Sequence, residues 1–127
     1  MGSQQLLLIV VGLIAVALMV YTGLTIMKSY YETSNRDQLI SSLNNLAILA
    51  QQYYKRPVEQ GGGGGAYARF TIPLNLRSTI VGNFNASARG NRVDFSATGV
   101  EIGRNGKTVV SVTCRVDRDG VRFTITN

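Results

Sequence analysis

The chain has 127 residues, with 13 Lys and Arg against 7 Asp and Glu, which gives a net charge of +6. It contains no His and a single Cys. The lack of histidine removes the commonest general base and metal ligand, and one cysteine forms neither an internal disulfide nor a thiolate zinc site. We therefore expect no enzyme, no cofactor and no metal, and a length that suits one domain.

Residues 1–27 carry no charged side chain, and Leu6–Met27 reads LLLIVVGLIAVALMVYTGLTIM. As a helix this segment is about 33 Å long, enough for a bilayer core of about 30 Å. Its apolar residues cover every face, so it must be surrounded by lipid or by copies of itself. A cleavable signal peptide fits less well, because no basic residue precedes a run that exceeds the usual length of roughly 7–15 residues. We predict that residues 1–27 form a transmembrane or filament-core helix.

Residues 28–56 are predicted to continue the helix in amphipathic form. The stretch from Lys28 to Tyr54 contains no Gly or Pro, and Pro57 favours a stop. One apolar stripe recurs at steps of three and four, which is the period of a helix face. We expect this stripe to pack on the rest of the chain; its members are Leu39, Leu43, Leu46, Ala50 and Tyr53.

Residues 57–66 are predicted to form a Gly-rich loop, because Gly61–Gly65 are five consecutive glycines. Such a run is typical of a flexible linker. A phosphate-binding loop would need a strand before it and a Lys-Ser/Thr helix start after it, and neither pattern is present. We therefore interpret the run as a plain spacer.

Residues 67–127 are predicted to form an antiparallel β head. Apolar and polar residues alternate along 93–97, 110–116 and 121–125, which is typical of half-buried strands. Asn105-Gly106 and Asp119-Gly120 are hairpin turn signals. We expect a meander of three or four strands, in which 100–102 pairs with 108–112 and 112–116 with 121–125.

The apolar face of this sheet needs a cover, and the helical stripe supplies one. Cys114 falls on the inward face and is expected to be a small buried hydrophobe. Tyr67–Ile80 is predicted to be a strand or an extended loop broken by Pro73. The predicted fold class is α+β.

The order of these segments resembles the type IV pilin family. The closest local match is Leu6–Leu24, and the Tyr30-Tyr31 pair beyond it also fits. The resemblance implies a long N-terminal helix, hydrophobic in its first half and amphipathic in its second, packed on a small antiparallel head. It also implies a structural subunit of a cell-surface filament that serves adhesion, motility or surface attachment. Before assembly the subunit would be inserted in the inner membrane and would meet the pilus assembly machinery.

The sequence departs from the family pattern near its N-terminus. The family usually carries a glutamate five residues into the mature chain, where this chain has Gln5, with Gln4 beside it. A neutral amide still accepts a hydrogen bond from an ammonium group, so we expect Gln4 or Gln5 to hydrogen-bond within the filament core. No basic leader is visible, and Cys114 lacks a partner for the family's disulfide loop. The residues expected at the polymerisation core are Met1, Gln4, Gln5, Leu6, Leu7, Ile9, Val10, Gly12, Leu13, Ile14, Ala17 and Gly23.

Two other functions remain open. The same apolar helix supports a single-pass anchored β domain that acts as a monomer. A basic head also suits DNA binding, because residues 69–122 hold nine basic and four acidic side chains. The side chains expected to line a phosphate-binding patch are Arg89, Arg92, Arg104, Lys107, Arg115, Arg118 and Arg122.

Overall fold

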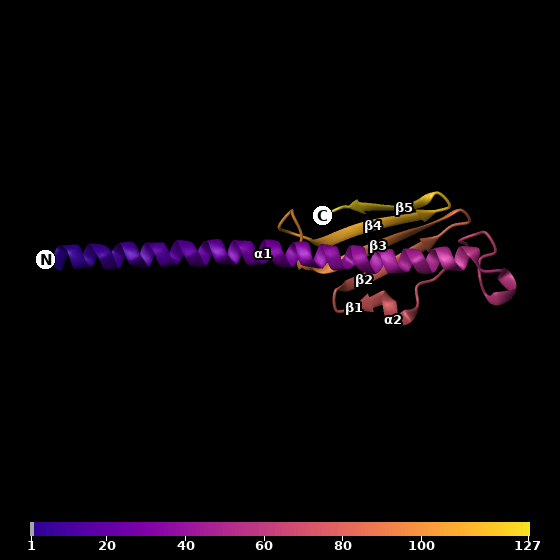
Figure 1. The fold of residues 1–127 in the computed structure, drawn as a ribbon, viewed down its shortest axis with the longest axis horizontal. Coiled ribbons are helices and arrows are strands. Elements are labelled where there is room, and N and C mark those ends of the chain that lie inside the picture. Colours follow the sequence, from indigo (N-terminus) through magenta and orange to yellow (C-terminus); the bar gives the residue numbers. More distant parts are fainter. Residues whose placement is uncertain (1) are drawn as a thin grey trace. The chain divides into compact units, whose positions relative to one another are not determined.

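The computed structural model describes residues 2–127 and has the predicted α+β fold (Figure 1). The chain divides into two compact units: an N-terminal unit that ends at Tyr31 and a sheet unit, Glu32–Asn127. The elements are α1 (Gly2–Lys55), a 3-10 turn η1 (Val58–Gln60), α2 (Leu74–Arg77), β1 (Ser78–Thr79), β2 (Gly82–Ala88), β3 (Arg92–Ile102), β4 (Val109–Asp117) and β5 (Gly120–Ile125).

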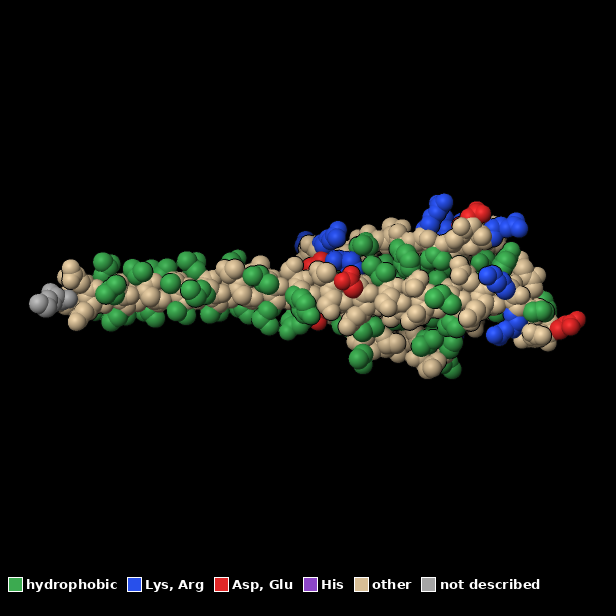
Figure 2. Space-filling view, in the orientation of Figure 1, with side chains coloured by type: hydrophobic (Ala, Val, Ile, Leu, Met, Phe, Trp, Pro, Cys, Tyr) green, Lys and Arg blue, Asp and Glu red, His purple; other side chains and the backbone are tan. Residues whose placement is uncertain are grey.

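The N-terminal unit consists of the first part of α1. Its large apolar side chains from Leu6 to Met27 are between 49% and 73% exposed, and Figure 2 shows hydrophobic side chains along the whole length of this segment. The hydroxyl groups of Thr22 and Thr25 donate to the carbonyls of Leu18 and Tyr21 one turn earlier, at 2.8 and 3.0 Å. The hydrogen bonds that these two hydroxyl groups donate are therefore made within the helix itself.

The sheet unit is built from the rest of α1 and a five-stranded antiparallel sheet with the order β1-β2-β3-β4-β5. The stripe expected on the helix lies against the inward face of the sheet. On the strands, the residues that pack against this stripe are the apolar ones at every second position, because alternate side chains of a strand point to the same face. The buried core consists of Leu39, Leu43, Leu46, Ala47, Ala50, Tyr67, Phe70, Ile72, Phe84, Val93, Phe95, Ala97, Val110, Val112, Cys114 and Val116.

The strand pairing agrees with the two predicted hairpins. Val112 pairs with Ile125 and Val116 with Val121, while Ile102 pairs with Val109 after a register shift. The sheet has five strands where three or four were expected. Two strands precede the predicted ones: the two-residue β1, and β2, which reads GNFNASA and has a low strand propensity because of its asparagine, glycine and serine residues. Its pairing with β3 along its whole length compensates for that weakness.

The segment Tyr67–Ile80 differs from the prediction. Residues 67–73 are not in regular secondary structure, and α2 follows at Leu74–Arg77 before the two-residue strand β1. Pro73 sits at the N-cap of α2 with φ −54°. Proline at this point starts a helix rather than only breaking a strand, because its fixed φ is compatible with the first turn.

The Gly-rich loop folds back on the end of α1 and is not a plain spacer. The amide groups of Gly63 and Gly65 donate to the carbonyls of Tyr53 and Tyr54 at 2.7 and 2.9 Å, and Gly64 donates to Arg56 at 2.9 Å. These bonds satisfy carbonyl groups that the last helical turn leaves free. The prediction of a flexible linker is therefore corrected: the glycines let the main chain approach the helix end closely enough to cap it.

Candidate functional site

The residues expected at the polymerisation core lie on α1 within the N-terminal unit. Those from Gln4 to Ala17 are exposed, and Gly23 is half-exposed. The expectation for Met1 falls outside the described residues. A Cβ added to Gly12 or Gly23 would meet no atom of the described chain within 4 Å. Packing within one described chain therefore gives no reason for a glycine at either position.

The N-terminal unit is also the part of the described chain that is long and apolar enough to span a membrane. Its most apolar window of 18 residues has a mean hydropathy of 2.6 and no buried residue. The length and composition of this segment suit a membrane anchor, and they suit a signal sequence equally.

The helical stripe is placed as the sequence suggests. Leu39, Leu43 and Ala50 are fully buried, and Leu46 is buried. Tyr53 is half-buried, and its hydroxyl donates to the Ala68 carbonyl at 2.7 Å.

One polar residue on this face was missed by sequence reasoning. The Asn35 side-chain amide donates to the Val81 carbonyl at 2.9 Å, and its oxygen accepts the amides of Val100 at 3.1 Å and Glu101 at 3.4 Å. Asn35 lies four residues before Leu39, so the helical period that identifies the stripe includes it. A polar residue at a position of the apolar stripe is the sequence signal that could have identified Asn35.

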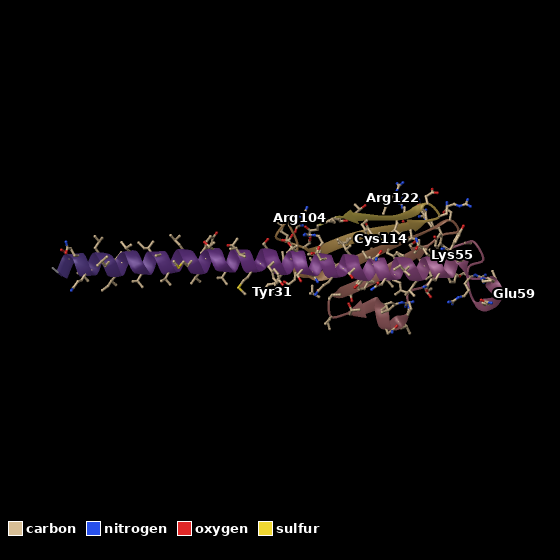
Figure 3. The ribbon with its side chains drawn as sticks, in the orientation of Figure 1. Tyr31, Lys55, Glu59, Arg104, Cys114 and Arg122 are labelled. Carbon is tan, nitrogen blue, oxygen red and sulfur yellow. The ribbon has the colours of Figure 1, made fainter. Side chains whose placement is uncertain are left out.

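The seven basic residues do not form one patch. Arg104 and Lys107 lie in the connection between β3 and β4. The other five lie on or beside β2–β5, toward the opposite end of the strands. The β2–β3 and β4–β5 connections are at that end (Figures 1 and 3). Antiparallel pairing separates them, because successive hairpin connections alternate between the two ends of a sheet.

Asp94 forms ion pairs with two of these five residues. Its Oδ1 lies 3.0 Å from Nε of Arg115, and its Oδ2 lies 3.5 Å from Nε of Arg92. The carboxylate therefore reduces the positive charge available to a phosphate chain at this point.

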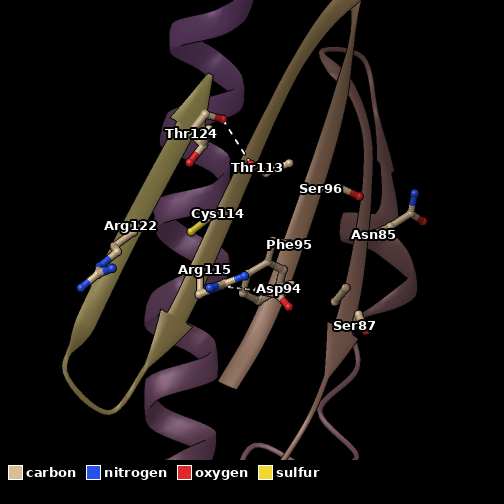
Figure 4. Close-up of a pocket in the computed structure, with 11 residues that line it drawn as sticks. Asn85, Ser87, Asp94, Phe95, Ser96, Thr113, Cys114, Arg115, Arg122 and Thr124 are labelled. Atoms are coloured by element: carbon tan, nitrogen blue, oxygen red, sulfur yellow. Dashed lines mark hydrogen bonds and ion pairs between the residues drawn. The ribbon is translucent and has the colours of Figure 1, made fainter. Parts of the chain in front are cut away.

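An open groove of about 620 Å³ crosses the outward face of the sheet, on the side away from α1 (Figure 4). We call it the polar groove. Side chains from four neighbouring strands meet in it, which the sequence alone could not show. Its polar lining residues are Asn85 and Ser87 of β2, Asp94 and Ser96 of β3, Thr113 and Arg115 of β4, and Arg122 and Thr124 of β5.

The lone cysteine is a buried core residue, as expected. Cys114 is 2% exposed, and burial raises the pKa of its thiol to about 11. A thiol that stays protonated at neutral pH is a poor nucleophile. Burial also raises the pKa of Tyr67, with further contributions from Tyr54 and Asp117. Among residues 2–127 no group of three or more His, Cys, Asp or Glu is arranged to hold a metal.

No protein-family model, no curated protein and no solved structure matches this chain.

Proposed function

We propose that the protein is the repeating structural subunit of an extracellular helical filament of the type IV pilus kind. It polymerises through the apolar segment of α1, and the sheet units form the outside of the filament. Before assembly the subunit is inserted in the inner membrane, where the pilus assembly machinery extracts it. The filament serves adhesion, motility or surface attachment.

The observation that carries this proposal is the exposure of the apolar segment. Every large apolar side chain from Leu6 to Met27 is at least 49% exposed in the single chain. Burial of a Val, Leu, Ile or Met side chain is worth about 1.5–3 kcal/mol relative to water. Fifteen such residues in this segment oppose a free monomer in water by tens of kcal/mol. The segment therefore needs lipid or other copies of itself.

The small residues of the segment support association of helices. Transfer of a helix from lipid to a bundle gains little hydrophobic energy, so close packing must favour the bundle. Gly12 and Gly23 have open space beside them in the described chain, and a glycine lets another backbone approach. A contact between copies that does not close into a ring produces a helical fibre.

Electron microscopy of the full chain tests this proposal. We expect long fibres after the detergent is removed from purified protein. Gly12→Ile should lower the fibre yield strongly, because it fills the space that a neighbouring helix needs. It should leave the single chain folded, because nothing in that chain obstructs the new side chain. Leu8→Ile, which keeps the volume at a position outside the expected polymerisation core, is the matched control and should assemble like the unchanged protein.

Gln5 provides a second test of the filament core. Its side chain is exposed on α1, and a polar amide surrounded by apolar helices must find a hydrogen-bond partner. Gln5→Leu should therefore reduce fibre stability on heating, measured by the loss of sedimentable protein. Unchanged yield and thermal stability would show that Gln5 has no such role.

The second candidate function is a single-pass anchored β domain that acts as a monomer. The length and hydropathy of the same segment support it. Dispersed single particles in nanodiscs, together with no fibres at any protein concentration after detergent removal, would favour this candidate over the filament.

A further inference from the structure

Two arginines hold opposing positions in the last strand pair of the sheet, but their guanidinium groups point apart, that of Arg115 toward Asp94 and that of Arg122 toward the outer edge of β5 (Figure 4). Arg115 on β4 pairs in register with Arg122 on β5, and both side chains are exposed on the outward face. Like charges that lie directly opposite each other in an antiparallel pair destabilise the sheet. An anion that pairs with the guanidinium group of Arg122 would relieve this repulsion.

The protein itself neutralises only one side of this pair. Asp94 binds Arg115 and shares its charge with Arg92. Within the described residues 2–127, Arg122 forms no ion pair with a carboxylate. Arg122 therefore presents a full set of guanidinium donors at the edge of the polar groove.

The rest of the groove consists of groups that both donate and accept hydrogen bonds. The hydroxyls of Ser87, Ser96, Thr113 and Thr124 and the amide of Asn85 extend from the arginine pair across the four strands (Figure 4). Such groups suit the many hydroxyls of a sugar chain, and the free acceptor capacity of Asp94 suits them as well. The volume of about 620 Å³ is in the range of ligand sites.

Nucleic acid fits this surface less well. The aromatic residue among those that line the groove is Phe95, which is 1% exposed and lies in the core, so it offers no platform for stacking bases. Asp94 also places a negative charge where a continuous row of phosphates would lie. A sugar chain needs no stacking platform, and its hydroxyl groups can donate to the Asp94 carboxylate.

We propose that the polar groove binds an acidic polysaccharide, with Arg122 holding a carboxylate and the Ser, Thr and Asn side chains holding sugar hydroxyls. Attachment of a filament to a surface through this ligand rests on the function proposed above. Binding by the groove does not require assembly and is measured on dispersed protein.

The test uses the full chain in detergent micelles and a fluorescently labelled oligomer of polygalacturonate, with dextran as the neutral probe. We expect saturable binding of polygalacturonate and no binding of dextran. Arg122→Gln should weaken binding roughly tenfold, because it removes a charged hydrogen-bond donor. Arg104→Gln removes the same charge in the β3–β4 connection and should change the affinity less than twofold. Thr124→Ala, with the charge intact, should weaken binding about threefold.

Several results would overturn the proposal. These are an absence of polygalacturonate binding, equal weakening by Arg122→Gln and Arg104→Gln, or tighter binding of duplex DNA at the same arginines. Circular dichroism of each variant shows whether the sheet is intact, and Thr124→Ala provides a reading that does not depend on charge. Failure of this proposal is distinct from failure of the filament proposal, because Arg122→Gln should form fibres normally while losing the sugar.

Discussion

The side-chain oxygen of Asn35 accepts the backbone amide of Val100 at 3.1 Å, which joins the helix to the far end of β3. Gly99 makes this approach possible, because a Cβ at that position would collide with the same oxygen. The amide nitrogen of Asn35 donates to Val81 just before β2. One buried side chain therefore ties β3 and the turn before β2 to the helix at one end of the sheet unit.

Replacement of Asn35 by alanine should lower the free energy of unfolding by about 1–3 kcal/mol, because it leaves the amide of Val100 and the carbonyl of Val81 without their part-buried partner. Urea unfolding of the full chain in detergent, followed by circular dichroism, measures this change. Asn44→Ala, at an exposed position of the same helix, should be within about 0.5 kcal/mol of the unchanged protein. Equal effects of the two substitutions would contradict the role of Asn35.

The glycine cap should be sensitive to a single methyl group. A Cβ on Gly63 would overlap the Ala66 carbonyl and lie 2.8 Å from a ring carbon of Tyr53. We expect Gly63→Ala to lower the free energy of unfolding by about 2–3 kcal/mol. Gly90 has open space beside it in the described chain, so Gly90→Ala should be neutral or stabilise by up to about 1 kcal/mol. Thermal unfolding of the two variants side by side separates these outcomes.

The buried thiol should make stability depend on pH in the alkaline range. Burial raises the pKa of Cys114 from 9.0 to about 11 in the folded chain. The unfolded chain therefore releases this proton first, and the stability that the neutral thiol provides is complete below pH 9 and is lost as the pH rises to about 11. Urea unfolding at pH 7, 9 and 11 should show the decline.

Cys114→Ala serves as the control for this prediction. Tyrosines also titrate in this range, and burial raises the pKa of Tyr67, so only the difference between the two proteins reports the thiol. That difference should shrink between pH 9 and pH 11. A constant difference would show that the thiol contributes no pH dependence.

Arg69 adopts a backbone conformation that favours glycine. Its φ is +68°, and it stands third in a turn that the hydrogen bond from the Phe70 amide to the Tyr67 carbonyl closes at 3.1 Å. A side chain in this region costs about 1–2 kcal/mol, of which the greater freedom of glycine in the unfolded chain offsets a part. Arg69→Gly should therefore stabilise the fold by about 0.5–1 kcal/mol. Arg89→Gly, an exposed arginine without positive φ, should not stabilise it.

Local patterns were sufficient for much of the fold. The helical period from Leu39 to Ala50, the alternation along β3 to β5 and the turn signal at Asp119-Gly120 each depend on residues close together in the chain. The strand β2 was missed because asparagine and serine at its alternating positions carry no strong signal. Its stability comes from pairing with β3, which no local pattern reports.

The sequence by itself determined that the chain has a charge-free apolar helix of membrane-spanning length and a β-rich remainder, because hydropathy and period are properties of consecutive residues. Only the tertiary structure decided that Asn35 joins the helix to Val81 and to β3, that the glycine run caps a helix, and that side chains of four strands meet in a polar groove. These features depend on groups that lie far apart in the sequence, and only the register of the sheet and the packing of the helix bring them together.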